Sequence, residues 1–223
     1  MDSTLRRTWA EIDLDALAHN YRTLRSRMGG RARFLGVVKA DAYGHGAVEV
    51  PRTLEELGAE YLAVSNLDEA LELRQGGVAL PILQLGLTPA DQTAQAMACR
   101  VTQAVWSERA ALDFSREAQK AGGTLKIHIK LDTGMSRLGF PCGEERFEES
   151  MEAIRRVCAL PGLEAEGIFT HFAVSDEADE DSRAYTLRQY RRFTAMTEAL
   201  ADKGVAFAIR HCANSGAAAG YPQ

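Results

Sequence analysis

Short apolar runs alternate along the chain with longer segments that have a helical pattern of apolar positions. Seven runs rich in β-branched or other apolar residues predict strands at 34–39, 61–65, 81–85, 101–106, 125–131, 164–171 and 207–212. Ser107 is expected to cap a helix over 110–121, which Gly122 closes. Thr88 and Pro89 are expected as the N-cap and first residue of another helix. The pattern therefore predicts strict alternation of strand and helix.

This alternation predicts parallel β/α units, which occur in open doubly wound sheets and in closed eight-stranded barrels. Seven units in 223 residues approach the usual barrel size of about 250 residues, whereas a doubly wound sheet usually has about five or six strands and a glycine-rich first turn. We therefore predict an α/β fold, a TIM-type (β/α)8 barrel that is incomplete, with about seven units. No linker or repeat marks a second domain, so residues 1–223 are expected to form a single domain.

One predicted strand has a polar face, which is unusual for a buried parallel strand. In LKIHIKL, residues 125–131, the two isoleucines and Leu131 share one face, while Lys126, His128 and Lys130 share the other. Helices cover the outside of a barrel, so only its mouth accommodates charges. Lys130 is therefore expected to point into the mouth.

Two further titratable side chains end predicted strands. Lys39 ends the first strand and His171 ends the sixth, so both are expected to meet Lys130 at the carboxyl end of the sheet, where active sites of this fold lie. Removing an ammonium group from water costs several kcal/mol unless a group of opposite charge pairs with it. Lys39 therefore either extends to water or takes part in chemistry.

The overall composition excludes several classes of function. The chain is 46% hydrophobic and has a net charge of −5, without the Lys/Arg cluster that a nucleic-acid partner requires. Its four cysteines are far apart and form no metal-binding or disulfide pattern, so reduced thiols are expected: Cys99, Cys142, Cys158 and Cys212. The N-terminal stretch lacks the apolar run of a signal peptide, and no later stretch could span a bilayer, so we expect a cytoplasmic protein.

Four motifs together carry a resemblance to a known family. In chain order they are VVKADAYGHGA, KLDTGMSRLG, EGIFTHFA and HCANSGAA, spread over nearly the whole chain. They resemble the successive motifs of the alanine racemase family. That family has an N-terminal barrel that binds pyridoxal 5′-phosphate, followed by a separate β domain. The resemblance implies that this chain corresponds to most of the barrel, without the eighth strand and the C-terminal β domain.

The resemblance implies roles for residues of the first and last motifs. Lys39 would form a Schiff base with pyridoxal 5′-phosphate and, once the substrate displaces it, would act as the catalytic base that moves the α-proton. Tyr43 and Ser215 would hold the cofactor phosphate, and Asn214 would bind the cofactor by shaping that loop. His45 is expected to be a structural hydrogen-bonding residue of the glycine-rich turn.

The two middle motifs supply the remaining candidates. By resemblance Arg137 would contact both the phenolic oxygen of the cofactor and the carboxylate of the substrate. His171 would pack against the pyridine ring. The lysine that matches Lys130 is often carbamylated in the family, which would make it an anion that orients Arg137; unmodified, Lys130 would pair with Asp132 or extend to water.

The resemblance implies an isomerase that interconverts L-alanine and D-alanine and supplies D-alanine for peptidoglycan, working as a homodimer when full length. A racemase of serine or another small amino acid is an alternative, as is a non-catalytic protein that binds or carries the cofactor; a decarboxylase is a weaker third. Arg137 favours a racemase, since a carrier needs no clamp for a substrate carboxylate. The 223-residue chain alone is expected to be inactive, because in the family a tyrosine of the partner subunit's C-terminal domain supplies the second proton-transfer group.

Two charged segments are expected to be structural. The acidic run at 176–183 lacks the spacing of a calcium loop and predicts a solvated loop before a helix. Arg188, Arg191 and Arg192 are expected to face solvent on that helix.

Gly216 stands where the family usually has alanine, which would loosen the phosphate loop.

Overall fold

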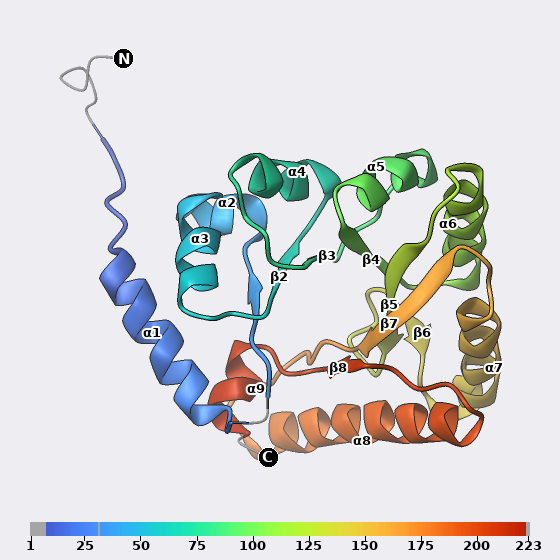
Figure 1. The fold of residues 1–223 in the computed structure, drawn as a ribbon. Helices are drawn as coiled ribbons and strands as arrows, with labels where there is room; N and C mark the ends of the chain where they lie inside the picture. Colours follow the sequence, from blue (N-terminus) through green and yellow to red (C-terminus); the bar gives the residue numbers. More distant parts are fainter. Residues whose placement is uncertain (1–7, 31, 222–223) are drawn as a thin grey trace.

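The computed structural model describes residues 8–30 and 32–221, which form a parallel sheet with helices along its outer side (Figure 1). The strands are β1 (Leu35–Val37), β2 (Tyr61–Val64), β3 (Ile82–Gln84), β4 (Val101–Val105), β5 (Leu125–Asp132), β6 (Phe140–Pro141), β7 (Leu163–Phe169) and β8 (Ile209–His211). The helices are α1 (Leu14–Arg27), α2 (Lys39–Gly44), α3 (Glu49–Glu56), α4 (Leu67–Gln75), α5 (Thr93–Ala98), α6 (Glu108–Lys120), α7 (Phe147–Cys158), α8 (Glu180–Asp202) and α9 (Ser215–Gly220). Two 3-10 turns are η2 (Ala90–Gln92) and η3 (Glu144–Arg146).

The strands follow one another around the sheet in the order β1-β2-β3-β4-β5-β7-β8. Every pair along this path is parallel, as the alternation of strand and helix requires. Among the described residues, β8 and β1 form the two ends of the path and do not pair. The predicted fold class, an incomplete TIM-type barrel, is therefore confirmed.

All seven predicted strands are present, each shorter than predicted or shifted by a residue at an end. The short β6 pairs with the end of β5 and was not expected, because two residues cannot show a periodic pattern. Lys39 and His171 each lie two residues beyond their strand, so the prediction that they end strands is wrong in this detail. Both still follow the carboxyl end of a strand.

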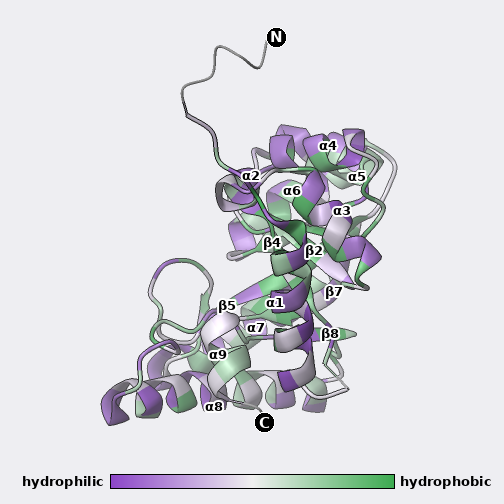
Figure 2. Ribbon diagram, turned by 90° about the vertical axis from the view of Figure 1, so that its left-hand side faces the viewer, coloured by the Kyte–Doolittle hydropathy of each residue, from purple (hydrophilic) through white to green (hydrophobic). Residues whose placement is uncertain are grey.

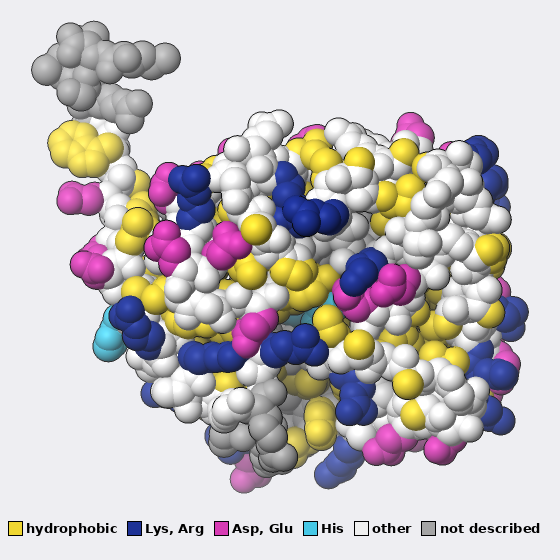
Figure 3. Space-filling view, in the orientation of Figure 1, with side chains coloured by type: hydrophobic (Ala, Val, Ile, Leu, Met, Phe, Trp, Pro, Cys, Tyr) yellow, Lys and Arg dark blue, Asp and Glu magenta, His cyan; other side chains and the backbone are white. Residues whose placement is uncertain are grey.

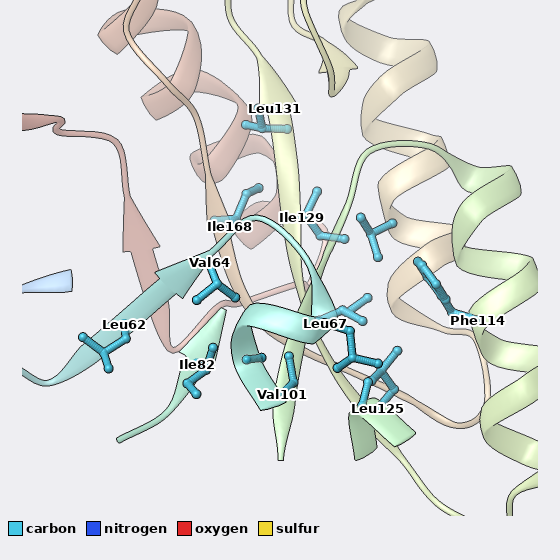
Figure 4. Packing of buried hydrophobic residues seen from close by; sticks show 14 of the residues in the cluster. Leu62, Val64, Leu67, Ile82, Val101, Phe114, Leu125, Ile129, Leu131 and Ile168 are labelled. Carbon is cyan, nitrogen blue, oxygen red and sulfur yellow. The ribbon is translucent and has the colours of Figure 1, made fainter. Parts of the chain in front are cut away.

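The two faces of the sheet bury different side chains. On β2, Leu62 and Val64 belong to the large core between sheet and helices, whereas Tyr61 and Ala63 belong to a small cluster inside the barrel. Figure 4 shows side chains of the large core from strands and helices packed together, including Leu62 and Phe114. This alternation follows from the two-residue period of a strand.

Side-chain caps begin several helices. The capping residues are Asp13, Asn66, Ser107, Asp179 and Asn214, each of which accepts a hydrogen bond from a backbone N–H in the first turn. The predicted cap at Ser107 is confirmed, with the Ala110 N–H 3.2 Å from its Oγ. The predicted cap at Thr88 is wrong: Pro89 precedes η2, and the Thr88 hydroxyl donates to Gln103 Oε1 at 2.5 Å instead.

Figure 2 shows that hydrophobic residues concentrate along the strands while the helices carry most of the hydrophilic ones. In the described part of the chain, helices with the length and apolar character needed to cross a membrane are absent. The acidic run begins as a loop before a helix, as predicted, but its residues from Glu180 on already belong to α8, which Asp179 caps.

Candidate active site

The lysine of the first motif lies in an unusual turn. Lys39 begins the short α2, in which Ala40 to Tyr43 all adopt left-handed backbone conformations, with φ between 49° and 58°. For residues other than glycine this conformation costs about 1–2 kcal/mol each. Gly44 and Gly46 follow with φ of 81° and 110°, which glycine adopts readily. The turn that carries Lys39 is therefore strained and must be held by other contacts.

Two carboxylates hold this turn. Glu69 of α4 accepts from the Ala40 N–H at 2.9 Å with one oxygen and from the Ser65 N–H at 2.7 Å with the other. Asp41 Oδ1 accepts from the Ala47 N–H at 2.5 Å. Glu69 thereby links the residue after Lys39 to the end of β2. The turn is fixed by charge-assisted bonds to backbone donors, which are stronger than neutral ones.

The histidine of the third motif shows which charges gather at this end of the barrel. His171 is half-buried, and its pKa is lowered first by burial and then by the positive charges of Arg137, Lys130 and Lys39. These charges come from the loop after β5, from β5 and from α2. The structure therefore brings together the titratable groups that strand order predicted to converge, and Arg137 with them.

Lys130 is almost buried and points to the inside of the barrel. Its Nζ donates to the Leu131 carbonyl at 2.8 Å and lies 5.3 Å from the centre of the Phe169 ring. Burial is the main cause that lowers the pKa of Lys130 to about 8. The charge of Asp132 raises this pKa, whereas the charge of Arg137 lowers it further. No ion pair joins Lys130 to Asp132 in the part of the chain that the structure describes, so that predicted pairing is wrong. Asp132 Oδ1 instead accepts from the N–H groups of Gly134 and Ser136 at 3.0 and 2.9 Å.

A cleft of about 390 Å³ opens beside His171. It is lined by the loop after β5, the segment after β7 and the start of α9: Met135, His171, Phe172, Ala173, Asp176, Asn214, Ser215 and Gly216. Figure 3 shows that basic side chains lie among hydrophobic ones around the middle of the visible face. Residues of the second, third and fourth motifs thus border one space.

The residues predicted to hold a phosphate differ in their exposure and in their hydrogen bonds within the protein. The Asn214 side chain is committed to the protein: its Oδ1 accepts from Ser175 Oγ at 2.6 Å and from the Ala217 N–H at 3.0 Å. Ser215 is exposed at the start of α9, and Tyr43 is 60% exposed. A hypothetical side chain at Gly216 would come within 3.0 Å of the Asp176 backbone, so glycine allows this close approach. Asn214 shapes the loop, while the two hydroxyl groups face solvent.

Inside the barrel lies a polar cluster that the sequence showed only in part. His128 Nδ1 lies 3.0 Å from His211 Nε2, and His128 Nε2 lies 3.4 Å from Glu166 Oε2. Tyr61 donates to Glu166 at 3.0 Å and Lys126 donates to it at 2.6 Å. Interactions with these neighbours, His128 first and then Lys126 and Tyr61, lower the pKa of Glu166 to about 2. The cluster keeps a carboxylate ionised inside the barrel wall.

A backbone irregularity explains why Glu166 was missed. The pairing of β5 with β7 shifts between Ile127 and His128, which leaves Glu166 as the extra residue of a bulge. Gly167 then lies opposite His128, where a side chain would approach the imidazole to 2.6 Å. Alternation counted from the sequence cannot reveal a bulge, although a glycine inside a strand is a signal for one.

The structure also tests the predictions for His45 and Arg192. His45 Nδ1 lies 3.0 Å from the Ala42 carbonyl, which fits its predicted structural role. Arg192 was expected to face solvent, but its Nη1 donates to the Thr133 carbonyl at 3.1 Å, so that prediction is wrong. Groups of three or more His, Cys, Asp or Glu side chains suited to a metal ion do not occur among the residues that the structure describes.

The sequence matches the family model described as alanine racemase, N-terminal domain, over residues 12–223. Among curated proteins the chain is 44% identical over 215 residues to the alanine racemase of Desulforamulus reducens and 42% identical over 223 residues to that of Clostridium perfringens. These alignments cover 96% and 100% of this chain but 56% of each relative. The chain therefore spans a little over half the length of the curated relatives it matches.

Solved structures agree with the sequence comparison. The alanine racemase of Clostridium difficile in complex with cycloserine superposes with a TM-score of 0.91 at 39% identity, covering 98% of this chain and 58% of that one. The alanine racemase of Bacillus anthracis with bound L-Ala-P superposes with a TM-score of 0.82 at 36% identity, covering 96% and 53%.

Proposed function

The chain belongs to the alanine racemase family, and from this we propose that it is the cofactor-binding part of an isomerase that uses pyridoxal 5′-phosphate to interconvert L-alanine and D-alanine. The observation that supports the proposal most is that Lys39, Lys130 and Arg137 all follow or end strands at the carboxyl edge of the sheet, and that their charges act on His171. This edge thus carries a primary amine suited to an aldehyde and a guanidinium suited to a carboxylate. A protein that only carried the cofactor would not need the guanidinium.

The side chains present fit pyridoxal 5′-phosphate. Lys39 is the amine that would hold the cofactor covalently. The exposed hydroxyl groups of Tyr43 and Ser215 are suited to a phosphate, and the second borders the cleft of about 390 Å³. His171 would contact the pyridine ring. Asn214 would contribute through the loop it caps, because its amide is already engaged with Ser175 and Ala217.

When bound, the cofactor supplies an electron sink that acidifies the Cα–H bond of the amino acid. Lys39 removes or returns the proton at Cα on one face of the substrate. Arg137 orients the substrate carboxylate through its planar fork of donors, which a lysine cannot reproduce. Burial is the first cause that lowers the pKa of His171, so the imidazole beside the ring favours its neutral form. Delivery of a proton to the opposite face needs a second group, which in this family the partner subunit supplies.

Lys130 has the properties of a lysine that can be carbamylated. Its pKa of about 8 leaves a substantial fraction of uncharged amine near neutral pH, and only the uncharged amine adds to carbon dioxide. The product is an anion beside Arg137, whose positive charge already acts on Lys130. Carbamylation would thus replace repulsion between two cations with attraction and fix the guanidinium.

The wider biological role follows from this activity. A small amino acid is the proposed substrate, and D-alanine for peptidoglycan the proposed product. We place the full-length protein in the cytoplasm as a homodimer, in keeping with the family. These proposals concern a protein of the relatives' full length, of which this chain matches a little over half.

The test uses the proton-transfer step that this chain could perform by itself. The chain is incubated with pyridoxal 5′-phosphate and either alanine enantiomer in D2O, and loss of the Cα–H signal is followed by NMR. Exchange at Cα of one enantiomer, abolished by Lys39→Ala and retained by the matched control Lys203→Ala, supports a racemase. A chain that binds the cofactor but exchanges neither enantiomer is a carrier, and the proposal is then wrong.

A further inference from the structure

The long helix α8 presents a row of polar side chains to the two loops that border the candidate site. Tyr185, Gln189 and Arg192 follow at intervals of four and three residues, so they share one face of the helix. In Figure 1, α8 runs along the lower edge of the barrel beneath β8. The row reaches the loop after β5, which carries Arg137, and the segment after β7, which carries His171.

Gln189 bonds to both segments at once and is fully buried. Its Oε1 accepts from the Ala173 N–H at 2.9 Å, and its Nε2 donates to the His171 carbonyl at 3.2 Å. The same nitrogen donates to Thr133 Oγ1 at 3.2 Å. A backbone N–H can only donate and a carbonyl can only accept, so the orientation of this amide is determined by its partners.

The bond to Thr133 continues as a directed chain. Thr133 Oγ1 lies 2.8 Å from Thr170 Oγ1, and Thr170 donates its single hydroxyl proton to the Leu131 carbonyl at 3.0 Å. Thr133 must therefore donate to Thr170 and accept from Gln189. Every member is buried, so each broken link would leave a polar group without water. The amide of Gln189 thus ends a hydrogen-bond chain with one possible direction.

The neighbours on the same helix face support the loop after β5. Tyr185 donates its hydroxyl proton to the Gly134 carbonyl at 2.5 Å, and Arg192 donates to the Thr133 carbonyl at 3.1 Å. A side chain at Gly134 would approach the Tyr185 hydroxyl to 2.7 Å, so glycine is what lets the loop come this close. The loop leads on to Arg137 three residues later.

We propose that Gln189 is a positioning residue that sets the spacing between the Arg137 loop and the His171 segment, and with it the relative placement of these two side chains. That this spacing matters for the substrate rests on the proposed function. That Gln189 sets the spacing is argued only from its hydrogen bonds, so this claim and the proposed function can be tested separately.

The test replaces Gln189 with methionine, which keeps the length of the side chain and removes its hydrogen bonds. Amide hydrogen exchange is measured at Ala173 and over 134–137, and the pH titration of His171 is followed by NMR, against the exposed helix variant Arg191→Ala. We expect exchange to rise at least about fivefold at these amides, which is what the loss of one buried hydrogen bond allows. The Arg191→Ala protein is expected to behave as the wild type.

The titration separates positioning from a general loss of stability. Burial is the first cause that lowers the pKa of His171, and the charges of Arg137, Lys130 and Lys39 lower it further; the acidic Asp176 lines the same cleft. If the Arg137 loop is released, the pKa of His171 rises toward its usual value, because one of the positive charges that lower it moves away.

Wild-type exchange and an unchanged His171 titration in Gln189→Met would overturn the inference. If that variant does not fold, Thr133→Val keeps the shape of the side chain and removes the hydroxyl group that accepts from Gln189. It should raise exchange over 134–137, and unchanged exchange there would equally overturn the inference. Cofactor labelling of Lys39 in the wild type is independent of both variants, so its failure contradicts only the proposed function.

Discussion

Replacing Glu69 with alanine removes a carboxylate that accepts from the Ala40 N–H at 2.9 Å and from the Ser65 N–H at 2.7 Å. Hydrogen bonds to an ionised group contribute about 1.5–3 kcal/mol each. Ala40 is exposed, so water replaces part of its lost bond, whereas Ser65 is half-buried. We expect the free energy of unfolding to fall by about 2–4 kcal/mol. For a chain of this size that is a decrease of roughly 4–16 °C in Tm.

The size of this effect reflects the turn that Glu69 holds. The left-handed residues after Lys39 cost about 1–2 kcal/mol each, and the carboxylate helps to offset that cost. Urea unfolding followed by circular dichroism gives the free energies for Glu69→Ala and for Glu72→Ala, an exposed acidic residue of the same helix α4. Glu69→Gln should be intermediate, since its amide oxygen can still accept one bond. A loss for Glu69→Ala no greater than that for Glu72→Ala would refute the reasoning.

Three further predictions concern the interior of the barrel. Gly167→Ala should lower the free energy of unfolding by about 1–3 kcal/mol, because the added methyl group meets His128 at 2.6 Å. Thermal unfolding measures this loss, and Gly143→Ala is the control because the space around Gly143 is open. Glu166 has a pKa of about 2 in the folded protein, below its value in the unfolded chain. Its contribution to stability is therefore complete above about pH 4.5 and is lost as the pH falls toward about 2. Glu166→Gln should flatten this part of the curve of stability against pH. Lys130 has a folded pKa of about 8, below its unfolded value, so stability should rise between about pH 8 and 10.5, and Lys130→Met should remove this rise.

The strands and the convergence of the site could be predicted because they depend on local patterns. The strand around Ile129 is buried on both faces and reads as an apolar run broken only by the polar residues that face the mouth. Once the strands are parallel, their carboxyl ends meet at one edge, and this brings Lys39, Lys130 and His171 together without knowledge of any side-chain contact.

The supports of the site could not be predicted because they join residues far apart in sequence. Glu69 reaches Ala40 across 29 positions, and Gln189 reaches Thr133 across 56. Helix periodicity gives each residue a face but does not say which loop that face meets. The left-handed turn after Lys39 is equally hidden, since alanine and aspartate have no general preference for this conformation and tertiary bonds impose it.

The most direct test of the central claim is to find which lysine binds the cofactor. The chain has five lysines, at 39, 120, 126, 130 and 203, and each can be separated by peptide mapping. The protein is incubated with pyridoxal 5′-phosphate, reduced with borohydride and digested, and the pyridoxyl group is located by mass spectrometry. We predict a label on Lys39 that Lys39→Arg removes and Lys126→Arg does not. A folded protein that retains no label, or carries it on another lysine, would contradict the account.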